Sequence, residues 1–184
     1  MIGFAPAQEE LALRVLIGAC FGVAHVAGLA RWAVLFVALI ASADLRAGTL
    51  KGRVVRILDG DTLAVLDSAK REHLVRIAGI DAPERGQANY ETSRQHLGSL
   101  VIGKMVTVEW SKRDRYGRLV GKVSADLADV GLQQVRAGQA WWYRDSAHEQ
   151  TAFDRSRYES AERDARLARR GLWNGSRPIP PWQW

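Results

Sequence analysis

The sequence predicts a mainly β, α+β domain in which five short strands form a small barrel and three helices flank it. Three observations support this fold class: apolar, β-branched runs come first, a helical repeat follows the third run, and the clearest helix lies near the C-terminus. Five short strands with one helix inserted after the third are typical of the OB-fold. With 184 residues, the chain has room for one such domain and an appendage.

The first three predicted strands lie close together in the chain. Residues 50–58 are apolar and β-branched, and Asp59-Gly60 is a strong hairpin signal before the second strand at 62–66. A second loop leads to a third strand at 74–78. Strand alternation places Asp61 on the apolar side of the second strand. A turn residue and a metal ligand are both possible readings of Asp61, but a carboxylate on that side needs a cation, a metal or a hydrogen-bond donor.

Three helices and two strands follow. In chain order they are a helix at 89–101, strands at 106–110 and 119–123, and helices at 130–137 and 148–170. Gly138 and Gly171 follow the last two helices, and a glycine there is a typical C-terminal signal. The Pro- and Trp-rich tail, residues 178–184, is expected to be non-helical, with its tryptophans packed against the barrel.

Residues 1–43 differ from the domain that we assign to 44–177. Arg31 precedes an apolar run and the triplet Ala41-Ser42-Ala43, which is the pattern of a secretory signal peptide cleaved after Ala43. Glu9 does not suit such a segment, so an uncleaved membrane anchor is the alternative. Either reading predicts export to the periplasm or the medium. N-terminal sequencing of the exported protein should begin at Asp44, and a cytosolic protein retaining Met1 would contradict the prediction.

Composition restricts the function classes. A single cysteine excludes a disulfide framework and a thiolate zinc site within the chain. The net charge is +6, and the excess of Lys and Arg lies after residue 43. A basic domain of this size is suited to a polyanionic partner, which the composition does not identify.

Charged residues gather in three clusters. The first is the Asp59–Thr62 turn, the second contains Arg76, Asp81 and Glu84, and the third is the loop 114–118. Taken singly, they read as a turn, an edge-strand ion pair and a charged hairpin loop. Taken together, two carboxylates and two arginines suit metal-assisted attack on a phosphodiester, because guanidinium groups match phosphate oxygens.

These clusters, in this order and spacing, resemble the thermonuclease family, the Ca²⁺-dependent nucleases of staphylococcal nuclease type. The resemblance covers residues 48–175 and is reinforced by the segments 140–144 and 171–173. It implies a five-stranded OB barrel with three helices. It also implies in-line hydrolysis of the 5′ P–O bond of DNA and RNA, single-stranded substrate being preferred, to leave 3′-phosphate ends. The enzyme is expected to act as a monomer.

The resemblance assigns a role to each residue of the site. Asp61, Asp81 and the backbone carbonyl of Ala82 would bind Ca²⁺, for which oxygen ligands are suited. Glu84 would activate the attacking water. Arg76 and Arg118 would neutralise the phosphate in the transition state.

Four further residues are implied to bind the substrate. Arg115 and Tyr116 match positions that hold a second phosphate. Tyr143 matches another phosphate-binding tyrosine, and Trp141 matches an aromatic that stacks on a base. A role for Trp141 and Tyr143 in packing is an equal alternative.

Two other function classes compete with a nuclease. An OB barrel can bind nucleic acid without cutting it, and a membrane-tethered basic domain can simply contact anionic surfaces. Degenerate binding modules lose acids or arginines, whereas this chain keeps Asp61, Arg76, Asp81, Glu84 and Arg118. The combined motifs therefore favour the enzyme.

Overall fold

The computed structural model describes residues 47–175 and 178–184. The predicted signal segment, residues 1–43, lies outside the described residues. No helix in the described part of the chain is long and apolar enough to cross a membrane.

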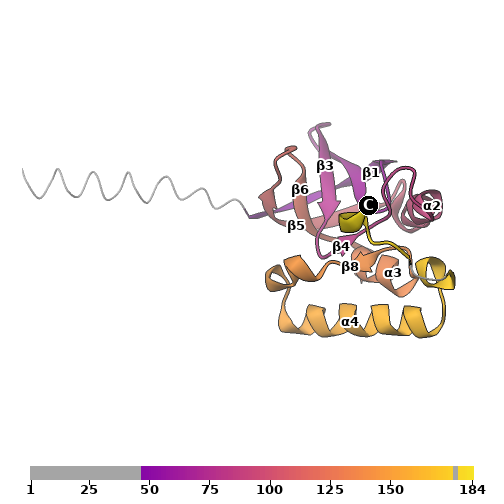
Figure 1. Ribbon diagram of the computed structural model, residues 1–184. Coiled ribbons are helices and arrows are strands. Elements are labelled where there is room, and N and C mark those ends of the chain that lie inside the picture. Colours follow the sequence, from indigo (N-terminus) through magenta and orange to yellow (C-terminus); the bar gives the residue numbers. More distant parts are fainter. Residues whose placement is uncertain (1–46, 176–177) are drawn as a thin grey trace, which may run out of the picture. The chain divides into compact units, whose positions relative to one another are not determined.

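Within the described residues, four strands precede the first helix, and the longest helix comes near the C-terminus (Figure 1). The strands are β1 (Gly48–Ile57), β2 (Thr62–Asp67), β3 (Glu72–Ile77), β4 (Ile80–Asp81), β5 (Met105–Arg113), β6 (Leu119–Ala125), β7 (Ala128–Asp129) and β8 (Trp141–Trp142). The α-helices are α2 (Tyr90–Val101), α3 (Val130–Arg136) and α4 (Ala152–Leu167). Short 3₁₀ helices are η1 (Arg144–Glu149), η2 (Gly171–Asn174) and η3 (Pro181–Gln183).

Five strands close the barrel. Their order is β3-β2-β1-β5-β6, with β7 added beside β6, and the neighbours in this order are antiparallel. Parallel pairing of β3 with β6 completes the closure, because Val75, Arg76 and Ile77 lie opposite the segment 119–121. The predicted fold class, a five-stranded barrel of OB type with helices, is confirmed.

The barrel interior is filled by alternate residues of the strands. Val54, Leu63, Val75, Val108 and Val123 are buried and belong to one core. Successive side chains of a strand point to opposite faces, so the apolar alternation that predicted these strands is also what fills the barrel.

Three helices cover the barrel as expected, with shifted boundaries. α2 buries Leu97 and Val101, and α3 packs against α4. The last helix begins at Ala152 rather than at 148, because the side chain of Thr151 caps it by accepting the backbone N–H of Asp154. The preceding residues form η1 instead.

Two local predictions are wrong. The last helix ends at Leu167 rather than at 170, because Arg169 adopts a left-handed backbone conformation. The tail is not free of helix, since Pro181–Gln183 forms the 3₁₀ turn η3. Proline suits the first position of such a turn because its fixed φ is already helical.

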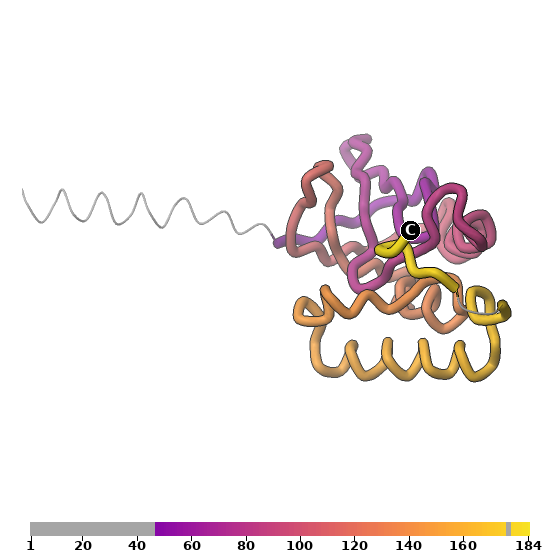
Figure 2. Tube along the Cα trace, viewed as in Figure 1, coloured from indigo at the N-terminus to yellow at the C-terminus, as the bar shows by residue number. Residues whose placement is uncertain are grey.

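A small second sheet, which the sequence analysis did not predict, joins the helical part of the chain to the barrel. Strand β4 pairs antiparallel with β8, so that Asp81 lies opposite Trp141 and Ile80 opposite Trp142. Figure 2 shows the C-terminal tail running back from the end of α4 toward this sheet. The pairing places residues of the 141–143 segment next to Asp81.

Candidate active site

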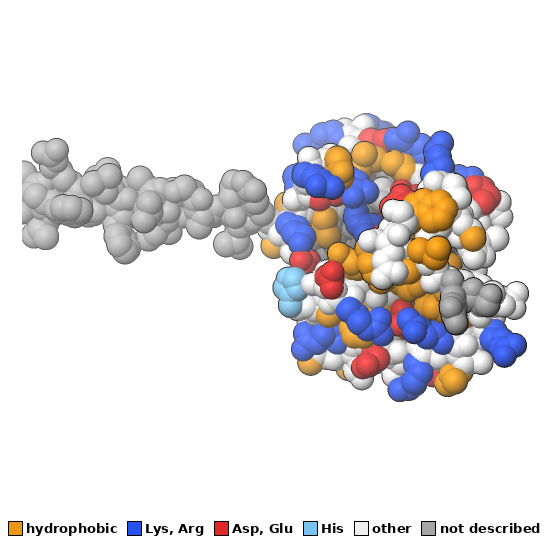
Figure 3. Space-filling view, in the orientation of Figure 1, with side chains coloured by type: hydrophobic (Ala, Val, Ile, Leu, Met, Phe, Trp, Pro, Cys, Tyr) orange, Lys and Arg blue, Asp and Glu red, His pale blue; other side chains and the backbone are white. Residues whose placement is uncertain are grey.

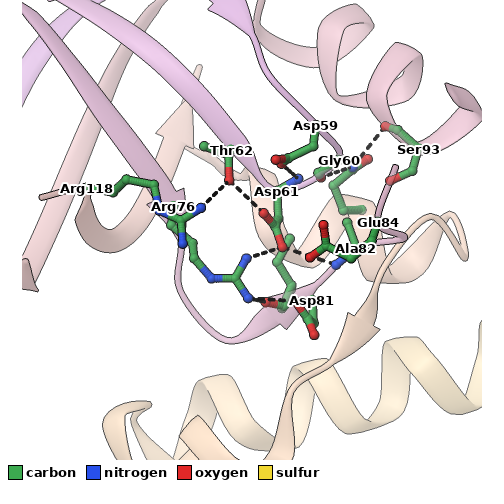
Figure 4. Close-up of polar contacts among 12 residues, drawn as sticks. Asp59, Gly60, Asp61, Thr62, Arg76, Asp81, Ala82, Glu84, Ser93 and Arg118 are labelled. Carbon is green, nitrogen blue, oxygen red and sulfur yellow. Dashed lines mark hydrogen bonds and ion pairs between the residues drawn. The ribbon is translucent and has the colours of Figure 1, made fainter. Parts of the chain in front are cut away.

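Two aspartates converge on one arginine at the end of the barrel (Figure 4). Nη1 of Arg76 in β3 donates to Asp61, and Nη2 donates to Oδ1 of Asp81 at 2.6 Å. The strand register explains this arrangement: Thr62 lies opposite Arg76 in the β2–β3 pair, and Asp81 follows one short turn after β3. Asp61 is 4% exposed, as the strand alternation predicted, and Arg76 supplies the cation it needs.

Arg118, the residue just before β6, reaches the same place through a hydroxyl. Its Nη1 donates to Oγ1 of Thr62 at 3.3 Å, and that hydroxyl donates to Oδ1 of Asp61 at 2.8 Å. Its Nε donates to Asp114 at 2.7 Å. Arg118 and Arg76 also line one open groove of about 550 Å³. The two predicted arginines are thus brought together, with donors left over for a ligand.

Ala82 and Glu84 follow Asp81 on the loop after β4. The backbone N–H of Ala82 donates to Oδ2 of Asp61 at 3.2 Å, which ties the two acidic segments together. Figure 4 shows the Glu84 side chain pointing toward Asp61. The backbone N–H of Glu84 donates to Oε1 of Gln87 at 2.8 Å, so a buried glutamine holds the loop that carries the acid.

Gly60 is required for a reason other than the predicted hairpin turn. The predicted hairpin between β1 and β2 forms, but Gly60 is not among the residues with positive φ, so a left-handed backbone is not what the turn needs from it. A Cβ at Gly60 would lie 1.9 Å from Oγ of Ser93 and 2.7 Å from Cβ of Ala82. The glycine therefore lets the Asp59–Thr62 loop pack directly against α2.

Gly60→Ala is expected to lower the free energy of unfolding by about 1–3 kcal/mol, the usual effect of overpacking. Chemical denaturation measures the change. Gly98→Ala is the matched control, because its Cβ would meet only Ile57, at 3.8 Å, and alanine favours a helix by about 0.5–1 kcal/mol over glycine. A Gly60→Ala protein as stable as the wild type would contradict this packing.

Asp59 is a site residue to which the sequence analysis gave no role. Its Oδ1 accepts the backbone N–H of Asp61 at 3.2 Å. Burial, together with the Asp61 carboxylate, raises the pKa of Asp59 to about 7. Burial and the Asp61 and Glu84 carboxylates raise the pKa of Asp81 to about 6, although Arg76 opposes the shift. The first aspartate of the Asp-Gly-Asp motif is the signal that could have identified Asp59.

Asp114 organises the loop between β5 and β6. Its Oδ1 accepts the backbone N–H groups of Tyr116, at 2.9 Å, and Arg118, at 3.0 Å. The ring of Tyr116 is 67% exposed and lies 4.9 Å from the guanidinium of Arg115 and 5.5 Å from that of Arg118. These residues line the groove beside the two arginines, where a phosphate-binding role is sterically available.

Trp141 and Tyr143 differ in their surroundings. Trp141 is only 4% exposed and packs edge-on against Trp173 at 5.9 Å and Trp182 at 6.3 Å. Of the two readings of Trp141, the structure favours packing, because little of the ring is accessible to a base. Tyr143 lines the groove with Arg76, and burial and the Asp145 and Asp81 carboxylates raise its pKa above the ordinary value.

The donor set suits a hard divalent cation. In the described part of the chain, no three acidic, His or Cys side chains meet as a ready metal cage. Two carboxylates, from Asp61 and Asp81, together with the carbonyl of Ala82 and water, require no such cage, since Ca²⁺ accepts mixed oxygen ligands. Asp59, Asp61 and Asp81 are three carboxylates around the guanidinium of Arg76, and burial, together with repulsion between the carboxylates, raises the pKa values of Asp59 and Asp81. Ca²⁺ would offset this excess negative charge.

Comparisons with known proteins agree with this arrangement. A family model described as "Staphylococcal nuclease homologue" matches residues 74–175, more than half of the chain. An "Uncharacterized endonuclease" of Escherichia coli O157:H7 is 43% identical over 136 residues, which cover 73% of this chain and 84% of the relative. A "Micrococcal nuclease" of Shigella flexneri is 41% identical over 160 residues, 82% of this chain and 86% of the relative. A "Probable staphylococcal-like nuclease CAN1" of Oryza sativa subsp. japonica is 36% identical over 115 residues, 62% of this chain and 33% of the relative.

Proposed function

The chain belongs to the staphylococcal nuclease family, and from that premise we propose that this nuclease depends on Ca²⁺ and cleaves the 5′ P–O bond of DNA and RNA to leave 3′-phosphate ends. One observation carries the proposal: Asp61 and Asp81 share the guanidinium of Arg76 within one buried cluster, with Glu84 directed toward them. A binding module without catalysis has no need of this arrangement.

The residues of the cluster divide the chemistry. Asp61, Asp81 and the Ala82 carbonyl would hold Ca²⁺, which when bound supplies a positive charge that polarises a phosphate oxygen and a water. Glu84 would accept the proton of the attacking water, because its carboxylate points into the cluster. Arg76 and Arg118 would bind the equatorial phosphate oxygens, whose negative charge grows in the transition state.

Substrate binding is assigned to the open groove. Arg115 and Tyr116 would hold a neighbouring phosphate, and Tyr143, which lines the same groove, would bind another. Such contacts with the backbone carry little sequence information, so we propose low sequence preference. A groove with exposed aromatic rings also favours single strands, since their unpaired bases can stack.

Export and a monomeric state belong to the same proposal. Export rests on the signal pattern of residues 1–43, and membrane contact would require that this segment is retained. Sedimentation of the mature protein would test the monomer, and a stable dimer would contradict it.

An assay of the product ends tests the proposal directly. The purified protein is incubated with single-stranded DNA and with RNA in Ca²⁺, and in parallel with a chelator. We expect cleavage in Ca²⁺ but not in the chelator. The products should carry a 3′-phosphate, so a polymerase should extend them only after a phosphatase has removed that phosphate. Equal cleavage in the chelator, or 5′-phosphate products, would contradict the proposed metal dependence or cleavage position respectively.

A further inference from the structure

The C-terminal tail is attached to the loop that carries Glu84. The side chain of Gln87 makes both links: its Oε1 accepts the backbone N–H of Glu84 at 2.8 Å, and its Nε2 donates to the carbonyl of Ile179 at 2.5 Å. Gln87 is 8% exposed, so water does not readily compete for these hydrogen bonds. The tail is therefore held at the edge of the candidate active site.

Trp182 is the tail residue that packs against the segment next to this site. Its ring lies 5.5 Å from that of Tyr143 and 6.3 Å from that of Trp141. Tyr143 in turn lines the groove that contains Arg76 and Arg118. Trp182 is not itself among the residues that line the groove, but it packs against one of them, Tyr143, and so lies next to the groove.

The ring of Trp182 remains partly exposed to solvent despite this packing. The residue remains 47% exposed, whereas Trp141 beneath it is 4% exposed. Figure 3 shows hydrophobic side chains gathered between the barrel and α4, with Lys and Arg side chains on either side of them. An accessible aromatic ring next to a groove lined by arginines offers stacking and charge together, which is the combination that single-stranded nucleic acid requires.

We propose that Trp182 forms an additional stacking site for an unpaired base of a single-stranded substrate, next to the phosphate-binding groove. This inference rests on the proposed function and deepens it, because it makes the tail a part of substrate binding. Tyr143 supports the Trp182 ring from one side, and Gln87 fixes the chain that carries it. Trp182 binds the substrate and takes no part in the bond-breaking step.

Steady-state kinetics on matched substrates test the proposal. The full chain and its variants are assayed in Ca²⁺ on an oligothymidylate, on the same oligonucleotide with abasic sugars beyond the cleaved linkage, and on a small nitrophenyl phosphodiester. For Trp182→Ala we expect KM on the oligothymidylate to rise about tenfold with kcat unchanged, as loss of one stacked base predicts. KM on the abasic and small substrates should not change.

Two variants control for the packing of the tail. Trp182→Phe keeps an aromatic ring and should retain most of the affinity for the oligothymidylate. Trp184→Ala removes a more exposed tail tryptophan, 64% exposed, that lines a different pocket together with Asn89, and should leave KM unchanged. Melting curves establish that each variant is folded.

The outcomes separate the two proposals. An unchanged KM in a folded Trp182→Ala enzyme, or an equal rise on the abasic substrate, would overturn the stacking site alone. Faster cleavage by Trp182→Ala would also overturn it, since the tail would then cover the groove rather than bind substrate. No hydrolysis of any substrate by the wild type would overturn the proposed function, and this inference with it.

Discussion

Replacing Arg118 by alanine is expected to lower kcat by about 10²–10³, the usual effect of removing one preorganised donor from a transition state. The side chain reaches the cluster through Thr62, and within the part of the chain that the structure describes its Nη2 makes no hydrogen bond to an acid. It is therefore placed to meet charge that grows on the phosphate. Rapid-quench assays on single-stranded DNA measure the loss.

Arg118→Lys should recover little of this activity. The guanidinium here uses Nε to bind Asp114 and Nη1 to bind Thr62, and a single ammonium cannot reproduce that fork. The loop should survive, because its backbone N–H at 118 still donates to Asp114. Arg163→Ala, on the exposed side of α4, is the matched control and should retain full activity. Near wild-type turnover in a folded Arg118→Lys protein would contradict the role of Arg118.

Asp81→Ala is expected to abolish the stabilisation of the domain by Ca²⁺ as well as its activity. At a Ca²⁺ concentration of about 100 times Kd, linkage gives the wild type about 2.7 kcal/mol, or roughly 5–10 °C in Tm. Calorimetry with and without Ca²⁺ measures the shift. An unchanged shift in Asp81→Ala would show that Asp81 is not a ligand.

Glu84→Gln separates the proton acceptor from the metal ligands. An amide cannot take a proton from water, so kcat should fall by about 10²–10⁴, while the Ca²⁺ shift in Tm remains. Loss of that shift together with activity would instead make Glu84 a metal ligand. Comparing Glu84→Gln with Asp81→Ala in one calorimetric series therefore assigns the two carboxylates.

The stability of the domain without Ca²⁺ is expected to depend on pH. The pKa values of Asp59 and Asp81 in the folded domain are raised to about 7 and about 6 from an ordinary value of 3.8. At a pH between the ordinary value and the raised values, the folded state therefore binds more protons than the unfolded state. The stability of the metal-free domain should consequently fall as pH rises from about 4 to about 7. Asp81→Ala should reduce that fall, and metal-free stability that rises over this range would contradict the assignment.

Much of the fold and of the site could be predicted from the sequence because the signals are local. Alternating apolar residues such as Leu63 and Val65 indicate strands and also fill the barrel. The burial of Asp61 follows from the same alternation, and the spacing between Arg76 and Asp81 brings an acid back to its arginine after one turn. The ends of the last helix were missed because they depend on the cap of Thr151 and the backbone conformation of Arg169.

The amino-acid sequence by itself therefore determined the order of the five barrel strands and three helices along the chain, the burial of Asp61, and the acids and arginines that are candidates for the site. Only the tertiary structure decided that the packing of α2 leaves no room for a side chain at Gly60. It also decided that Trp141 is buried while Trp182 is exposed, and that the tail is hydrogen-bonded to the loop that carries Glu84. Gln87 and Ile179 are 92 residues apart in the chain. The paired strands β4 and β8 are likewise distant in the chain, with α2 and α3 between them. Contacts of this kind depend on how surfaces formed by distant segments fit together, and no local pattern of residue types encodes that fit.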